Sequence, residues 1–231
     1  MKQQLYYPTI MEYDYIFKIL VLGSHCTGKT SILHKFTDNI ALVNPQPTIG
    51  VDFKTSYHKD FLNRNIKLHF WDTGGHPDYD SIIEPYYKNT AGAIIVFDVT
   101  NPRSFIDVDY FLQNLALFSN SNIKLPILLI GNKVDKKDKR VISSLEAMTY
   151  AKENKLYYLE TGKNADVDKD KDKDKDFEDK FGEFFNGITR HYIDNNISHP
   201  GVRRGYKTIS INENSRDCNN TRQKMDCCFP S

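Results

Sequence analysis

The chain has 231 residues, a formal net charge of +1 at pH 7 and 39% hydrophobic residues. This length allows one large domain with a buried core and additional segments, and the near balance of charge argues against nucleic acid as a partner. No apolar run approaches the ~20 residues that span a bilayer, and residues 1–15 are too polar for a secretory signal. Three of the four cysteines lie near the C-terminus and Cys26 lies in a glycine-rich loop, so we expect free thiols in a reducing compartment.

The first elements are a strand, a loop and a helix. Residues 1–14 lack periodicity and are expected to form a flexible arm, whereas residues 16–22 predict a strand and residues 31–36 predict a helix. The loop between them reads Gly23-Ser24-His25-Cys26-Thr27-Gly28-Lys29-Thr30, which fits G-x-x-x-x-G-K-[ST] in full. The backbone amides of such a loop cradle phosphate groups. Lys29 would then reach the terminal phosphates, and the Thr30 hydroxyl would bind Mg²⁺.

Later elements alternate between strand and helix. Residues 38–47 contain prolines and predict an exposed loop, residues 51–58 and 65–71 predict an antiparallel hairpin that turns at residues 62–65, and residues 77–89 are a polar, proline-containing connection. Further strands are expected at residues 93–99, 126–131 and 156–159, and helices at residues 101–118, from 143 onward and at 177–193. This order predicts an α/β fold with a mostly parallel six-stranded sheet, one antiparallel edge pair and helices on both faces.

Two segments lie outside this architecture. Residues 166–176 are dominated by alternating aspartate and lysine, which predicts a solvated insertion before the last helix. The alternate aspartates also suggest a calcium-binding loop, but no register places glycine at the sixth position and glutamate at the twelfth, so we favour the insertion. Residues 196–231 are polar and lack an apolar stripe, which predicts a flexible tail after a domain that spans residues 15–195.

Five short motifs follow one another along the chain. They are the loop Gly23 to Thr30, Thr48, Asp72-Thr73-Gly74-Gly75, Asn132-Lys133-Val134-Asp135 and Thr161-Gly162-Lys163. In this order they resemble the five nucleotide-binding motifs of Ras-like small GTPases. The segment Thr48 to Phe53, Trp71 before Asp72, Tyr86-Tyr87-Lys88 and the paired cysteines near the end look like the Rab family. The resemblance extends over about residues 15–193 and the C-terminal cysteines.

The resemblance implies a guanine site built from the last two motifs. The Asp135 carboxylate would accept hydrogen bonds from the N1–H and the exocyclic amine of guanine, which adenine cannot supply. Asn132 would brace the loops and bind the base, and the stem of Lys133 would lie along the base. The segment formed by Thr161, Gly162 and Lys163 would complete this part of the site, largely through its backbone.

The resemblance also implies a site for Mg²⁺ and the γ-phosphate of GTP. Thr30, Thr48 and Asp72 would hold the metal ion, Asp72 through water, and the Gly75 amide would meet the γ-phosphate. Because Thr48 and Gly75 would contact that phosphate only in GTP, its loss would release both segments. The residues expected to take part in hydrolysis are Lys29, Thr48 and His76.

Two departures from the family pattern concern hydrolysis. The family usually has a glutamine where His76 stands, which orients the attacking water, and it has glycine or serine where His25 stands, which leaves room for a partner's arginine. We therefore expect intact GTP binding and slow hydrolysis. Two alternatives stay open: His76 replaces the glutamine adequately, or the chain is a pseudo-GTPase, a constitutively GTP-bound interaction module. A nucleotide kinase is disfavoured, because Asn132 to Asp135 would then have no role.

The C-terminal sequence Cys227-Cys228-Phe229-Pro230-Ser231 allows two kinds of lipid modification. As a double-cysteine ending, Cys227 and Cys228 would both carry geranylgeranyl groups, whereas as a C-a-a-X box Cys228 alone would be farnesylated. Pro230 is unusual in the second, so we favour two groups, which give stable anchoring. The resemblance then implies a monomer on the cytoplasmic face of an intracellular membrane, cycling with the cytosol. It would act in vesicle traffic with an exchange factor, a GTPase-activating protein, a GDP dissociation inhibitor or escort protein, and effectors.

Overall fold

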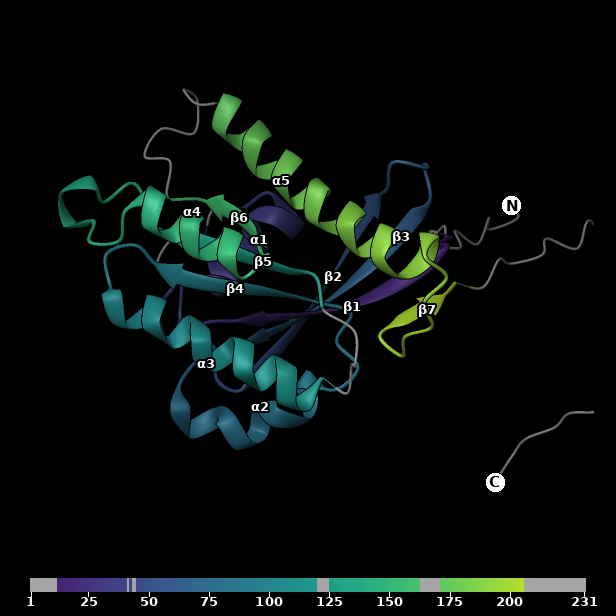
Figure 1. Cartoon of the computed structure of the whole chain (residues 1–231), viewed down its shortest axis with the longest axis horizontal. Coiled ribbons are helices and arrows are strands. Elements are labelled where there is room, and N and C mark those ends of the chain that lie inside the picture. The colour runs from purple at the N-terminus through teal and green to yellow at the C-terminus, as the bar shows by residue number, and fades with distance from the viewer. Residues whose placement is uncertain (1–11, 41, 43–44, 120–124, 163–170, 206–231) are drawn as a thin grey trace, which may run out of the picture.

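The computed structural model describes residues 12–40, 42, 45–119, 125–162 and 171–205, with residues 171–176 described by their backbone alone. Within these residues one sheet forms the centre and helices lie on both of its faces (Figure 1). The strands are β1 (Tyr15–Leu22), β2 (Val51–Lys59), β3 (Asn65–Thr73), β4 (Gly92–Asp98), β5 (Ile127–Asn132), β6 (Tyr157–Glu160) and β7 (Val202–Arg204). The α-helices are α1 (Lys29–Asp38), α2 (Asp80–Tyr87), α3 (Pro102–Phe118), α4 (Ser144–Glu153) and α5 (Lys171–Thr189); the short helices are η1 (Pro77–Tyr79), η2 (Lys137–Lys139) and η3 (Arg190–Asp194).

The strand order of the sheet is β2-β3-β1-β4-β5-β6, and β7 pairs with β1. All pairs along this order are parallel except β2 with β3, so the predicted fold class and the antiparallel edge pair are confirmed. Because β1, β3, β4, β5 and β6 run in the same direction, their carboxyl ends meet at one edge of the sheet. Four of the predicted functional motifs lie at or just after these strand ends, and Thr48 precedes β2, which starts at the same edge because it runs antiparallel to β3.

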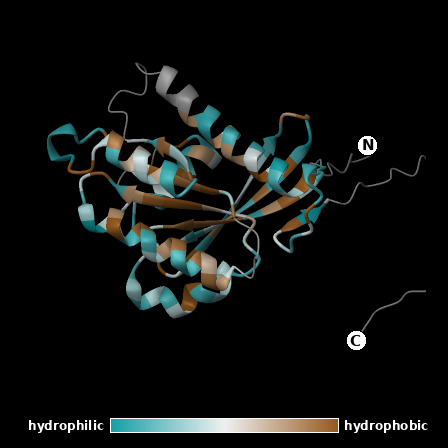
Figure 2. Cartoon of the chain, in the orientation of Figure 1, coloured by the Kyte–Doolittle hydropathy of each residue, from teal (hydrophilic) through white to brown (hydrophobic). Residues whose placement is uncertain are grey.

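The core consists of two apolar layers, one on each face of the sheet. Alternate residues of β1 point to opposite faces, so Ile19 joins the layer under α1 and α5 while Leu20 joins the layer under α2, α3 and α4. The strands in the middle of Figure 2 are therefore mostly apolar, whereas the helices carry polar residues on their outer faces. No helix in the described part of the chain combines the length and the apolar character needed to cross a membrane.

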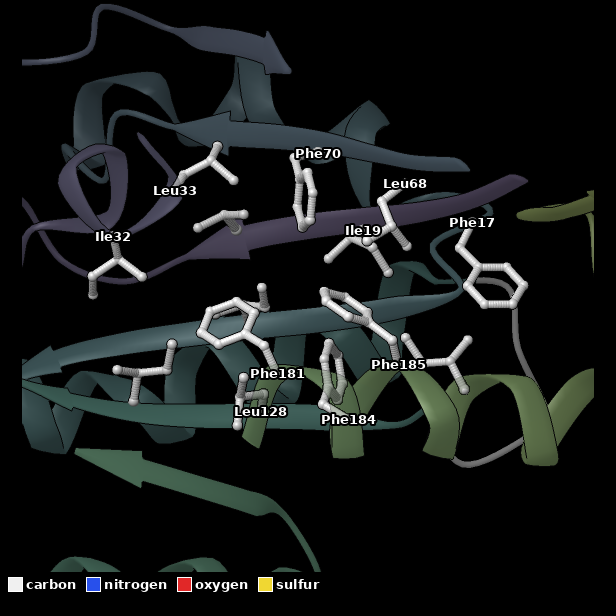
Figure 3. Packing of buried hydrophobic residues seen from close by; sticks show 14 of the residues in the cluster. Phe17, Ile19, Ile32, Leu33, Leu68, Phe70, Leu128, Phe181, Phe184 and Phe185 are labelled. Atoms are coloured by element: carbon white, nitrogen blue, oxygen red, sulfur yellow. The ribbon is translucent and has the colours of Figure 1, made fainter. Parts of the chain in front are cut away.

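Phenylalanines dominate the layer beneath α5 (Figure 3). Phe177, Phe181 and Phe185 recur every four residues, so they share one face of α5 and all three are buried. The ring of Phe36 from α1 stacks on Phe181, with 4.6 Å between ring centroids. These contacts hold α1, and with it the last residues of the glycine-rich loop motif, against the last helix.

Residues that cap helices and form turns correctly predicted the starts of α3 and α4 and the turn between β2 and β3. The Asn101 side chain accepts a hydrogen bond from the Arg103 amide at the start of α3, and the Ser143 side chain accepts one from the Glu146 amide at the start of α4. The turn between β2 and β3 has Asn63 in the left-handed region, with φ 59°.

Three elements differ from the expectation. Helix α2 lies in the segment that we read as a polar connection; it contains Pro85, and its apolar residues Ile83 and Tyr87 are buried against the core. Helix α5 begins at Lys171, within the charged segment 166–176, so the backbone of residues 171–176 is helical and not an open insertion. Residues 163–170 lie outside the described part of the chain.

The third difference is β7, a strand in the region that we assigned to the tail. Strand β4 begins opposite Ile19, so it leaves the first residues of β1 unpaired on that side. The strand β7 fills the gap, with Val202 opposite Phe17 and Arg204 opposite Tyr15. The Lys18 amide donates to the Gly201 carbonyl at 2.9 Å, which extends the pairing.

We expect Gly201→Ala to detach β7 from the sheet. A methyl group at the buried Gly201 would lie 2.0 Å from the Asn89 carbonyl oxygen, so the substitution should lower the free energy of unfolding by about 1–3 kcal/mol in urea titration. Gly182→Ala is the matched control, because Gly182 lies within α5 and a methyl group there meets its nearest neighbour at 3.7 Å. It should stabilise the protein by roughly 0.5–1 kcal/mol. Equal stability of the two variants would show that β7 contributes nothing to the fold.

Candidate functional site

The loop between β1 and α1 is built around close backbone packing. A methyl group at Gly23 would lie 2.1 Å from the Val96 carbonyl oxygen, and Gly23 has φ 140°. Such a position accepts only glycine without a shift of the backbone. The loop consequently lies tight against the carboxyl end of β4, and its amides lead directly into the first turn of α1.

Lys29, the first residue of α1, is buried within this loop. Its Nζ donates to the Gly23 carbonyl at 2.7 Å and to the Ser24 carbonyl at 3.0 Å. Burial lowers the pKa of Lys29 to about 8, and the negative charge of Asp72 opposes this shift. The loop therefore holds a buried ammonium group at the place where the motif predicts phosphate.

Thr30, Thr48 and Asp72 meet at the carboxyl end of β3. The Thr30 hydroxyl donates to the Asp72 carboxylate at 2.5 Å, and the Thr30 and Thr48 hydroxyl oxygens are 2.7 Å apart. The second carboxylate oxygen of Asp72 is buried and accepts no hydrogen bond from the described residues. Burial raises the pKa of Asp72 to about 6, against the hydrogen bond from Thr30 and the charge of Lys29.

This cluster fits Mg²⁺. Magnesium prefers a small number of hard oxygen ligands and keeps several waters, and the cluster offers two hydroxyls and one carboxylate. The orphaned Asp72 oxygen is a buried acceptor without a partner among the described residues. Such an atom is costly unless a cation or a donor reaches it.

The second part of the site joins the ends of β5 and β6 to the phosphate loop. The buried Asn132 side chain donates to the Thr27 carbonyl at 2.7 Å, and Lys133 Nζ donates to the Cys26 carbonyl at 2.6 Å. Lys133 also forms a 2.6 Å ion pair with Asp98 at the end of β4. Burial alone would raise the pKa of Asp98, but the hydrogen bonds from Lys133 and Thr100 outweigh it and lower this pKa.

Asp135 and Gly162 lie next to each other in the same part of the site. A methyl group at Gly162 would lie 2.4 Å from Asp135 Oδ1, and the Val134 amide donates to the Thr161 carbonyl at 3.2 Å. The structure thus brings together the two motifs that were predicted to hold the base. Lys163 lies outside the described residues, as do Cys227 and Cys228.

His25 and His76 face each other across the phosphate end of the site. Their rings meet edge to face with 6.0 Å between centroids. His25 Nε2 lies 3.0 Å from the Cys26 sulfur, and His76 Nδ1 accepts from the Asp78 amide at 3.3 Å. His25 also lines a cavity of about 730 Å³ between the loop, α2 and α3.

Sequence reasoning missed two acidic residues that position the loop. The Ser24 hydroxyl donates to the Asp107 carboxylate on α3 at 2.8 Å, and Asp98 holds Lys133 as described above. Asp98 gave a usable signal, because it is an acidic residue at the end of a buried strand. Asp107 gave none, because its partner lies 83 positions away in the sequence.

A parallel sheet whose carboxyl edge carries a glycine-rich loop, a buried lysine and a threonine–aspartate cluster defines a P-loop nucleotide-binding domain. A family model described as the Ras family matches residues 18–172. The Ras-related protein Rab-1 of Theileria parva is 42% identical over 156 residues, which are 67% of this chain and 70% of that protein. The Ras-related protein RABA2a of Arabidopsis thaliana is 32% identical, with 95% of this chain and 97% of that protein covered. The GTP-binding protein ypt3 of Schizosaccharomyces pombe is 33% identical, with 94% and 98% covered.

The chain belongs to the Rab family of Ras-like small GTPases. This confirms the resemblance drawn from the five motifs, and it makes the protein a small GTPase, that is, a GTP hydrolase.

Asn132→Ala should weaken the link between the two halves of the site. Loss of the hydrogen bond to the Thr27 carbonyl should lower the free energy of unfolding by about 1–3 kcal/mol and speed the release of a fluorescent guanine nucleotide. Asn101→Ala serves as the control, because it removes the cap of α3 at a cost of about 1 kcal/mol without touching the loop. If both variants released nucleotide at the wild-type rate, the link would have no role in binding.

Proposed function

We propose that the chain binds GTP and GDP together with Mg²⁺ and acts as a membrane-anchored switch in vesicle traffic, with slow GTP hydrolysis. The observation that carries this proposal is the convergence of Thr30, Thr48 and Asp72 beside the buried ammonium group of Lys29. A cation site and an anion site side by side suit a metal–phosphate ligand. The role in traffic rests on the relatives, three of which carry Rab or Ypt names.

The residues on the phosphate side have separate roles. The loop amides and Lys29 would bind the β- and γ-phosphates, and Thr30, Thr48 and Asp72 would hold the metal ion, which neutralises phosphate charge when bound. Gly75 has φ 71°, and its Cα lies close enough to the loop that an added methyl group would be 2.5 Å from Lys29 Nζ. Its amide could therefore contact the γ-phosphate, so that the presence of this phosphate would fix the position of the segment that begins at His76.

Base choice would rest on Asp135. A carboxylate that accepts from two guanine donors rejects adenine, since adenine presents an acceptor at the ring position where guanine has N1–H. Asn132 and Lys133 tie this loop to the phosphate loop through Thr27 and Cys26. Binding of the base would thus be linked to the position of the phosphates.

The geometry of His76 supports slow hydrolysis. His76 Nδ1 lies 3.3 Å from both the amide nitrogen and the carboxylate of Asp78, so only Nε2 is left to contact a water. A single ring nitrogen offers the attacking water one hydrogen bond, whereas a glutamine side chain offers both a donor and an acceptor. The His25 ring lies opposite the His76 ring, with 6.0 Å between their centroids. A side chain of this size at that position would hinder the entry of an arginine supplied by a partner.

The surface that effectors bind would lie next to the segments around Thr48 and Gly75, which we call the switch segments. The rings of Phe53, Trp71 and Tyr86 form a row, with 4.9 Å and 5.0 Å between successive centroids. Ile49, next to Thr48, is 82% exposed. Ile49 beside Thr48 and Tyr86 in the segment after Gly75 would shift on loss of the γ-phosphate relative to Phe53 and Trp71, which are paired in the sheet, so an effector could distinguish GTP from GDP.

The remaining features of the proposed cycle follow the family. An exchange factor, a GTPase-activating protein and a GDP dissociation inhibitor or escort protein would act on the chain as a monomer. Geranylgeranyl groups on Cys227 and Cys228 would anchor it to the cytoplasmic face of an intracellular membrane, because two lipid groups hold a protein where one short chain does not. The chain would cycle between this membrane and the cytosol.

Asp135→Asn should exchange guanine preference for xanthine preference. Xanthine presents a carbonyl where guanine has its amine, so the amide of the variant can donate to it. We expect the dissociation constant for GTP to rise at least ~100-fold and that for xanthosine triphosphate to fall, by titration with fluorescent nucleotides. Asp138→Asn, in the exposed helix η2 of the same loop, is the control and should bind GTP as the wild type does. Unchanged GTP binding by Asp135→Asn would exclude Asp135 as the base-selecting residue.

Single-turnover hydrolysis of bound GTP tests the role of the two histidines. The wild type should be slow, and His76→Gln should be at least ~10-fold faster because the amide can both donate to and accept from the attacking water. His25→Gly should increase the rate of hydrolysis mainly when a GTPase-activating protein that supplies an arginine is added. His191→Gln, at the other end of the sheet in η3, should hydrolyse GTP at the wild-type rate. An ordinary wild-type rate would contradict slow hydrolysis, and slow turnover in all variants would favour the pseudo-GTPase.

A further inference from the structure

The end of the sheet opposite the nucleotide site gathers four segments that are distant in sequence. They are the turn between β2 and β3, the start of β1, the helix η3 that follows α5, and β7, all at the right of Figure 1. Pairing fixes this arrangement, because Tyr15 of β1 lies opposite both Ile66 of β3 and Arg204 of β7. The described chain leaves the domain here, where the Gly205 amide donates to the Asp14 carbonyl at 2.7 Å.

The turn at this end exposes two large apolar side chains. Phe61 is 46% exposed and Leu62 is 57% exposed. The turn is nevertheless firmly built: the buried Asp60 accepts hydrogen bonds from the amides of Leu62 and Arg64, each at 2.9 Å. The Phe61 amide donates to Asn186 on α5 at 3.2 Å. A rigid turn that holds apolar groups in solvent suits contact with another surface.

Basic residues surround these apolar side chains. Arg190 of η3 lies over the Phe61 ring at 4.8 Å, and Lys59, Arg190, Arg203 and Arg204 are all exposed. The two neighbouring acids Asp60 and Asp194 are both bound to Arg64, at 2.6 Å and 3.1 Å. Three further acidic residues lie near this end: Glu183 pairs with Lys180 at 3.1 Å, Asp14 accepts from the Asn65 amide, and Glu12 is exposed. The exposed charge at this end is therefore mainly positive.

We propose that this end of the domain is a membrane-contact face, in which Phe61 and Leu62 enter the headgroup region of a bilayer and the arginines contact anionic phospholipid. Exposed apolar side chains surrounded by basic residues fit an anionic lipid surface better than a neutral one. We call the exposed basic residues Lys59, Arg190, Arg203 and Arg204 the basic rim. The inference rests on the proposed lipid anchor. Cys227 follows Gly205 by about 22 residues, a length that spans at most ~75 Å, so an anchor there would raise the effective concentration of the domain at the bilayer, with this end as the point of attachment.

Photo-crosslinking of the prenylated full-length chain on vesicles tests the face. A photoreactive benzophenone residue replaces Leu62 in one variant and Leu145 in the control; Leu145 is 75% exposed at the start of α4, near the nucleotide edge of the sheet. On vesicles of phosphatidylcholine with 30% phosphatidylserine, about a common anionic fraction, the lipid adduct should form at least ~10-fold more at position 62. Retained GTP binding checks that both variants are folded.

A charge variant tests the basic rim. Arg203→Gln with Arg204→Gln should reduce the lipid adduct at position 62 by ~10-fold or more, and so should vesicles of phosphatidylcholine alone. Lys137→Gln with Lys139→Gln, in η2 at the opposite end, should leave the adduct unchanged.

The alternative outcomes are distinct. Equally low lipid adducts at both positions, with protein that sediments with the vesicles, would overturn the contact face and leave the anchor intact. Adducts of position 62 with a second copy of the chain, or with its own residues 1–11, would overturn it in favour of a protein contact. Failure of the prenylated chain to sediment would refute the anchor and, with it, this inference.

Discussion

The buried pair of opposite charges formed by Lys29 and Asp72 is the constraint around which the site is arranged. Burial lowers the pKa of Lys29 to about 8 and raises that of Asp72 to about 6, so each charged form is disfavoured in the protein alone. Short hydrogen bonds hold both residues: Lys29 donates to the Gly23 and Ser24 carbonyls, and Asp72 accepts from the Thr30 hydroxyl. A ligand that brings a phosphate and a divalent cation would complement both charges at once, which explains why the fold tolerates this arrangement.

The site also depends on contacts between segments that are far apart in sequence. Asn132 and Lys133 reach the phosphate loop from β5, and Asp107 reaches Ser24 from α3. The loop is therefore positioned both by residues at the end of β5 and by a helix that packs on one face of the sheet. In the proposed cycle the two histidines lie beside Gly75, whose segment would move on loss of the γ-phosphate, so a change of residue there would affect the rate of hydrolysis more than nucleotide binding.

The sequence predicted those parts of the structure that depend on local patterns. The glycine-rich loop, the helix caps at Asn101 and Ser143, and the buried strands β4 and β5 each have a signal within a few residues. The strand β7 had no such signal, because it exists only where β4 is too short to cover β1. In α2, Pro85 and the polar residues conceal a short apolar face. The contact between Ser24 and Asp107 depends on tertiary structure alone, so no spacing in the sequence indicates it.

The hairpin formed by β2 and β3 rigidly connects the nucleotide site at one end to the Phe61–Leu62 turn at the other. Strand β2 has nine residues, so its ends are ~30 Å apart at the usual rise per residue. Thr48 precedes the first end and the Phe61–Leu62 turn follows the second. If the turn contacts a bilayer, the aromatic row of Phe53, Trp71 and Tyr86 and the segment around Thr48 are held well above the lipid surface. The switch would then face the cytosol, where an effector can approach it without displacing lipid.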